Sequence, residues 1–200
     1  MSSVISICNL ALSNIAKPDI QDIDEDSAEA VACKRFYAHT LDVLLQSYPW
    51  RFARTTQALA EVANTRADRW GYAYQRPTDC LKVLRVSDVY DLAYMQSDGL
   101  SVIAGGYAYD IEGDTVYCGL TPAYLVYTQR LTDPTKFPPL FIEALAWHLA
   151  VRLAMPLTRD PKVRADAYQL AVQTFGQAGV ADANEVREVE DAPSRAIEGR

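Results

Sequence analysis

The sequence contains few of the residues on which metal and nucleophilic chemistry depends. Its 200 residues include only two histidines and four cysteines. No two cysteines stand close enough in sequence to form the CxxC pair of a zinc or redox site. The HExxH, GxSxG and P-loop motifs are also missing. These absences exclude the familiar metalloprotease, serine-hydrolase and P-loop sites and favour a protein that is not an enzyme and needs no cofactor.

Targeting and membrane signals are missing as well. No basic region precedes the apolar residues at the N-terminus, so a secretory signal is not predicted. The longest apolar stretch, residues 137–157, is interrupted by Glu143, His148 and Arg152. A membrane span needs about 20 nearly uninterrupted apolar residues, so we expect a core helix there. We also expect buried, reduced thiols and a soluble protein made in a reducing cytoplasm.

Negative charge is concentrated at the two ends of the chain. The net charge is -7, of which residues 1–32 carry -5 and residues 181–200 carry -3, while residues 33–180 carry +1. A general nucleic-acid binder normally presents a basic face. The charge therefore argues against a protein that grips DNA, but it allows one that encircles DNA and binds protein partners through its ends.

Four segments show the apolar spacing of helices. The first is capped by Ser2 or Ser3 and is stopped by Pro18. The second begins at an approximate capping box formed by Asp26 and Glu29. The acidic residues that precede it resemble a calcium loop only superficially, because no glycine lies among them, so a solvated linker is expected.

The other two helices lie near the C-terminus and are bounded by prolines. The third follows Pro138 and is expected to end at Pro156. The fourth begins where Asp160 precedes Pro161, which is the pattern of an N-cap followed by proline at the first helical position.

The middle of the chain is rich in tyrosine, valine and turn residues, which predicts a small antiparallel sheet over about residues 70–130. Strand patterns occupy residues 81–86, 115–118 and 124–129. Gly105 with Gly106 predicts a hairpin turn between residues 100–103 and 107–111. The predicted fold class is α+β, mainly α: a bundle of about four helices with an inserted small antiparallel β-region.

This pattern divides the chain into four parts. Residues 1–58 form helices 1 and 2, residues 59–134 the inserted β-region, residues 135–180 helices 3 and 4, and residues 181–200 a flexible acidic tail. The last four residues, 197–200, match the recognition sequence of the protease factor Xa, so an engineered cleavage site and a native end are both open explanations for them.

Nine of the 12 tyrosines lie in the β-region. Tyrosine combines a large contact area with a hydroxyl group and is favoured at protein interfaces. A platform for stacking bases would need positive charge nearby, but residues 90–129 contain no lysine or arginine. Protein contact is therefore favoured over nucleic-acid contact, and core packing accounts for some of these tyrosines.

Two other functions remain open on the residues alone. An enzyme or small-molecule binding module would have its best candidate site in an acidic pocket formed by Asp110, Glu112 and Asp114, provided that they converge in a deep cleft. A host regulatory protein with a helical dimer interface is a weaker alternative.

Several segments occur together in an order and spacing that identify a family. They are residues 7–15, 24–33, 48–53, 76–83, 132–134 and 137–146. The set resembles the head-to-tail adaptor proteins of short-tailed bacteriophages, a family similar to tail tubular protein A, over about residues 4–180. The acidic tail departs from any part of this pattern.

The resemblance implies a structural protein of the virion tail that is made in the host cytoplasm. Such adaptors are helical bundles with an inserted β-region. They form a dodecameric ring of identical subunits between the portal protein and the tail nozzle protein. DNA passes through the ring without sequence-specific binding, no membrane is involved, and there are no catalytic residues or cofactors to carry over.

Two groups of contact residues are expected from this role. Portal contact is assigned to the fourth helix and to the C-terminal segment from Asp182 to Arg195, through Asp182, Glu185, Arg187, Glu188 and Arg195. Ring or nozzle contact is assigned to the tyrosine-rich region, through Tyr94, Tyr107, Tyr109 and Tyr117.

Overall fold

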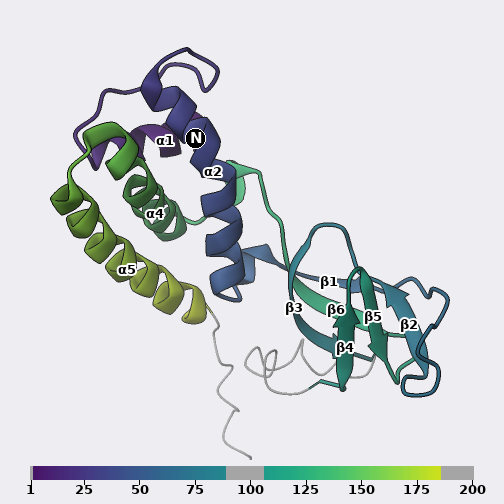
Figure 1. Cartoon of the computed structure of the whole chain (residues 1–200). Helices are drawn as coiled ribbons and strands as arrows, with labels where there is room; N and C mark the ends of the chain where they lie inside the picture. The colour runs from purple at the N-terminus through teal and green to yellow at the C-terminus, as the bar shows by residue number, and fades with distance from the viewer. Residues whose placement is uncertain (1, 89–105, 186–200) are drawn as a thin grey trace, which may run out of the picture. The chain divides into compact units, whose positions relative to one another are not determined.

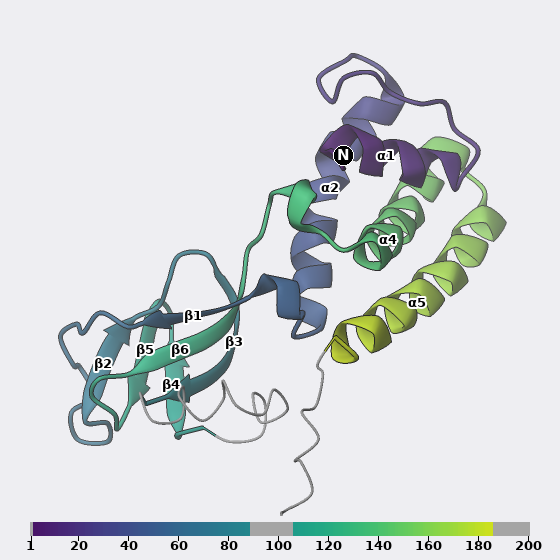
Figure 2. The same ribbon diagram turned by 180° about the vertical axis from the view of Figure 1, so that it is seen from behind.

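The computed structural model of the chain describes residues 2–88 and 106–185 (Figure 1, Figure 2). Its elements are α1 (Val4–Ser13), α2 (Ala28–Ser47), η1 (Arg51–Ala53), β1 (Arg54–Ala58), β2 (Tyr72–Gln75), β3 (Cys80–Ser87), β4 (Tyr109–Glu112), β5 (Thr115–Cys118), β6 (Tyr124–Gln129), η2 (Pro134–Lys136), α4 (Pro139–Thr158) and α5 (Pro161–Ala183). The predicted fold class, α+β and mainly α, is confirmed.

The described chain forms two compact units. The helical unit contains residues up to Thr56 together with Thr78–Leu84 and Tyr127–Ala183, and the β unit contains Gln57–Pro77 and Arg85–Val126. Two segments of the predicted β-region, residues 78–84 and 127–134, therefore belong to the helical unit. The reason is local packing, because Leu81 and Leu131 lie against the core of the helices.

The first two helices begin at serine caps. Ser3 accepts a hydrogen bond from the backbone N–H of Ser6, and the Ser6 hydroxyl oxygen accepts one from the backbone of Ser3, which makes a capping box. α2 is capped by Ser27, one residue after the predicted Asp26. The Ser27 hydroxyl accepts from Ala30 N–H and donates to the Glu25 carboxylate, which fixes it in the capping position.

The third predicted helix, α4, runs past its expected end. Pro156 lies inside its last turn, and the helix closes only at Arg159, which adopts a left-handed conformation with φ 56°. The predicted start of α5 is confirmed, because the Asp160 carboxylate accepts from Lys162 N–H. α5 then continues to Ala183, so the first residues of the predicted tail are helical.

α4 lies at the centre of the helical unit and packs against α1, α2 and α5 (Figure 1, Figure 2). Its leucines Leu145, Leu149 and Leu153 are fully buried. Of the described helices, α4 is the one long and apolar enough to cross a membrane by length and composition, a test that buried core helices also pass. The prediction of a core helix in this stretch is confirmed by the burial.

An aromatic cluster closes one end of this core. The Trp50 side chain is 1% exposed and makes edge-on contacts with Phe141 and Phe175, with ring centroids 5.1 Å and 5.7 Å away. Its indole N–H donates to the Leu44 carbonyl at 2.8 Å. The turn after α2 is therefore fixed by both apolar contact and a buried hydrogen bond.

The strands form two three-stranded antiparallel sheets, in the orders β1-β6-β3 and β2-β5-β4, rather than the single predicted sheet. β5 pairs with β2 through Tyr72 opposite Cys118 and with β4 through Glu112 opposite Thr115. β6 follows β5 in sequence but joins the other sheet, between β1 and β3. β1 was missed because its last three residues are exposed, which leaves no alternating pattern.

Gly106 is required by a close approach within the β unit. It has φ +133°, and a Cβ at this position would lie 2.5 Å from Cγ of Arg85. The next residue, Tyr107, donates its backbone N–H to the Val86 carbonyl. The other half of the predicted hairpin, residues 100–103, lies outside the described residues.

Candidate interaction surfaces

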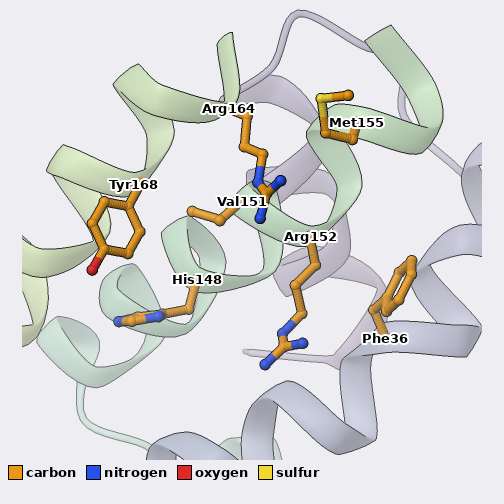
Figure 3. A pocket seen from close by; sticks show the side chains of 7 residues that line it. All are labelled: Phe36, His148, Val151, Arg152, Met155, Arg164 and Tyr168. Atoms are coloured by element: carbon orange, nitrogen blue, oxygen red, sulfur yellow. The ribbon is translucent and has the colours of Figure 1, made fainter. Parts of the chain in front are cut away.

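The helical unit contains a groove of about 480 Å³ along α4 (Figure 3). It is lined by Phe36, His148, Val151, Arg152, Met155, Arg164 and Tyr168, and we call it the α4 groove. Four of these residues, at positions 148, 151, 152 and 155, follow the i, i+3, i+4, i+7 spacing of a single helix face. Phe36 of α2 and the α5 pair Arg164 and Tyr168 form its sides.

The groove is cationic. Arg152 and Arg164 both line it, no acidic residue does, and neither arginine forms an ion pair with any of the residues that the structure describes. Burial, followed by the nearby charge of Arg152, lowers the pKa of His148 below its ordinary value. The groove can therefore accommodate negative charge that the chain itself does not supply there.

Large side chains at the groove are exposed. Tyr168 is 59% exposed and Met155 is 39% exposed. The structure thus leaves aromatic, thioether and guanidinium groups together on one surface. This site was not predicted from the sequence, where His148 and Arg152 are visible only as interruptions of the apolar stretch over residues 137–157.

The most acidic described surface of the helical unit is the connection between α1 and α2. Residues 19–26, which we call the acidic loop, contain five carboxylates and no basic residue. Glu25 accepts hydrogen bonds from the backbone of Gln21 and Asp22, which holds the loop in shape and, after the stronger Ser27 contact, helps to lower the pKa of Glu25. Asp24 pairs with Lys34.

The predicted portal contacts do not share one surface. Asp182 is only 7% exposed, and both of its carboxylate oxygens accept hydrogen bonds from the backbone N–H of Arg51. Its expected place in an exposed tail is wrong, because α5 extends through this position. Glu185 is exposed, and Arg187, Glu188 and Arg195 lie outside the described residues.

The predicted contact tyrosines differ in their exposure to solvent. Tyr107 is 42% exposed and donates its hydroxyl to Asp88, and Tyr109 is half-buried in β4. Tyr117 is buried, because β5 is the central strand of its sheet, and its hydroxyl lies 2.8 Å from Thr65 Oγ1. Its expected place at an interface is therefore wrong. Tyr94 lies outside the described residues.

The three acidic residues that an enzyme or small-molecule binding module would use lie at the β4–β5 hairpin. Asp110 accepts a hydrogen bond from Arg66 at 2.8 Å, and Glu112 lies 3.6 Å from the same guanidinium. Arg66 also stands over the ring of Tyr117, 5.3 Å from its centroid. The Arg66 contact lowers the pKa of Asp110. Asp114 is exposed in the turn. Asp110 and Glu112 therefore pair with Arg66 instead of converging with Asp114 in a cleft.

No candidate metal site is formed within residues 2–88 and 106–185, where no group of three or more histidine, cysteine or acidic side chains could hold an ion. Comparison with models of known protein families and with curated protein sequences finds no match to the chain.

Proposed function

We propose that the chain is a head-to-tail adaptor of a short-tailed bacteriophage: a structural protein that forms a ring between the portal protein and the tail nozzle protein. The observation that carries this proposal is the ordered set of segments between residues 7 and 146 that resembles this family. The arrangement of a helical unit interrupted in sequence by a β unit agrees with the architecture that the resemblance implies.

The charge distribution supports the same role. Residues 33–180 carry a net charge of only +1. Each phosphate that a lysine or arginine neutralises adds salt-dependent affinity for DNA. A body that is nearly neutral lets DNA pass through a ring without being held in it, while the acidic ends are available to protein partners.

The proposal is tested by assembly with a portal protein. The purified chain is mixed with portal protein from the same source over a range of salt and protein concentrations, and the products are imaged by electron microscopy. We expect a ring of the chain seated on the portal ring. Portal alone and chain alone are the controls, and the absence of any such complex in all conditions would reject the adaptor function.

A tyrosine variant separates the role of the β unit from that of the helical unit. Tyr107 is the most exposed of the described candidate tyrosines, so Tyr107→Ala is expected to weaken ring or nozzle assembly without unfolding the chain. Tyr117→Phe is the matched control, because that ring is buried and only its hydroxyl contact with Thr65 is removed.

A further inference from the structure

The lining of the α4 groove has the composition of a protein-binding surface. Its seven residues include two aromatic side chains, two arginines and a methionine. These residue types are enriched in the centres of protein interfaces, whereas lysine, aspartate, glutamate and alanine are depleted there, and none of those four lines the groove. Tyrosine and arginine are also the side chains that most often dominate binding energy.

The charge of the groove specifies the chemistry of its partner. Arg152 from α4 and Arg164 from α5 project from different helices (Figure 3), and no described acidic residue pairs with either. A partner that covered both guanidinium groups without offering carboxylates would leave two charges desolvated and unpaired, which is costly. The partner segment should therefore be acidic.

The chain itself carries such a segment. The acidic loop holds five carboxylates within eight residues, and it is shaped by its own hydrogen bonds, so little ordering is needed on binding. Four of these carboxylates, on Asp19, Asp22, Asp24 and Asp26, are exposed. Asp24 pairs with Lys34, whereas Asp22 and Asp26 form no ion pair with any described residue.

We propose that the acidic loop of one copy of this chain docks in the α4 groove of a second copy. Asp22 and Asp26 of the first copy face Arg152 and Arg164 of the second, and the exposed ring of Tyr168 covers the contact. The choice of a second copy as partner rests on the proposed ring as well as on the charge complementarity of the two surfaces.

The two surfaces are different patches of the same molecule. Repeated head to tail, the contact is heterologous, so each copy uses its loop on one neighbour and its groove on the other. Such an interface closes into a ring when its rotation allows and otherwise extends as a filament. A two-fold dimer, in which each loop enters the other copy's groove, would use the same pairing but stop at two subunits, so the measured mass distinguishes it from a ring.

Charge reversal with exchange tests the pairing. One variant carries Arg152→Glu with Arg164→Glu, and a second carries Asp22→Lys with Asp26→Lys. Each variant alone should fail to self-associate. Sedimentation and mass photometry at low salt test this for the free protein, and imaging of portal-bound rings tests it in the assembly. Mixing the two should restore self-association, because the unchanged loop of the first fits the unchanged groove of the second, and the reversed surfaces fit each other.

Matched controls separate a specific contact from net charge and from misfolding. Lys136→Glu with Lys162→Glu reverses two exposed lysines of the helical unit that do not line the groove, and should associate as the unaltered chain does. Circular dichroism verifies the fold of every variant. With Asp22, Arg152 and Arg164 unchanged, Asp26→Cys on one copy and Tyr168→Cys on another should form a mixed disulfide under oxidation, whereas Asp26→Cys with Lys136→Cys should not.

The outcomes distinguish this inference from the proposed function. Portal-bound rings that form equally well with both reversed variants would overturn the loop–groove contact and leave the adaptor function standing. Loss of portal binding by the groove variant, with self-association unchanged, would assign the groove to the portal and also overturn the inference. Charge-dependent self-association without any portal complex would support the contact and reject the adaptor function.

Discussion

The carboxylate of Asp182 accepts hydrogen bonds from the backbone N–H of Arg51 through both oxygens, at 3.0 Å and 3.1 Å. The bonds join the last turns of α5 to η1, across 131 residues of sequence. Close by, the Tyr48 hydroxyl donates to the Gly179 carbonyl. The end of α5 is therefore anchored to the turn that follows α2, and Asp182 is a structural residue of the helical unit.

Removal of this carboxylate should destabilise the fold. Asp182→Ala removes the carboxylate that accepts from the part-buried Arg51 N–H, which should lower the free energy of unfolding by about 1–3 kcal/mol. Asp182→Asn keeps one acceptor oxygen and should cost less. Urea unfolding measures both, and Glu185→Ala, at an exposed position, should have little effect. Equal loss in Glu185→Ala and Asp182→Ala would contradict this role.

Trp50 should be sensitive to a change that keeps its aromatic character. Trp50→Phe removes the indole N–H that donates to the Leu44 carbonyl and leaves space between Phe141 and Phe175. A loss of about 2–4 kcal/mol is expected from the buried hydrogen bond and the cavity together. Trp147→Phe is the matched control, because the bond of Trp147 to Glu143 is exposed and its loss should cost little. A similar loss in both variants would argue against a special role for the Trp50 cluster.

The helices could be predicted from the sequence because their signals are local. The apolar spacing located all four helices. Ser3 caps α1 and Asp160 caps α5, and both are residues that the sequence offered as caps. The errors also have local causes. α4 continues for two residues past Pro156 although the proline removes one helical hydrogen bond, and Ser27 displaced Asp26 as the cap because Glu25 orients its hydroxyl.

The sheets and the α4 groove depend on contacts that sequence pattern does not encode. Nothing in the segment before β6 indicates that it leaves β5 and joins β1 and β3. The groove residues come from three helices, and Phe36 is separated by more than a hundred residues from the rest. The helical spacing of four of them, at positions 148, 151, 152 and 155, is visible in the sequence. Which face of α4 stays uncovered by α2 and α5 is decided only when the helices pack.

The four cysteines should be unreactive in the native protein. All are buried, and the thiols of Cys8 and Cys33 are in contact within the core of the helical unit. That contact, with burial, raises the pKa of Cys8, and burial raises the pKa of Cys118. Labelling with a thiol reagent should be slow at neutral pH and should reach four thiols in urea, as counted by mass spectrometry. Rapid native labelling of any one of them would show that its site is open.

His148 should make the fold sensitive to acid. Its pKa in the folded chain lies below its ordinary value of 6.5, because of burial and of Arg152. As the pH falls through 6.5, the unfolded chain takes up this proton before the folded chain does, so the folded state loses stability. Urea unfolding at pH 7.5 and pH 5.5 should show a smaller difference in His148→Gln than in the unaltered chain. His39→Gln, at an exposed position, should keep the full difference, and a reduced difference there as well would contradict the assignment.

Arg66 should control the titration of Asp110. The hydrogen bond from Arg66 is the main cause of the lowered pKa of Asp110, with a smaller contribution from the charge of Arg69. Arg66→Ala should therefore raise the pKa of Asp110 towards its ordinary value, as measured by following its carboxyl carbon in NMR spectra during an acid titration. Arg69→Ala removes the same charge without the hydrogen bond and should move the pKa in the same direction by less. If the two variants shifted Asp110 equally, general charge rather than the 2.8 Å contact would be holding the carboxylate ionised.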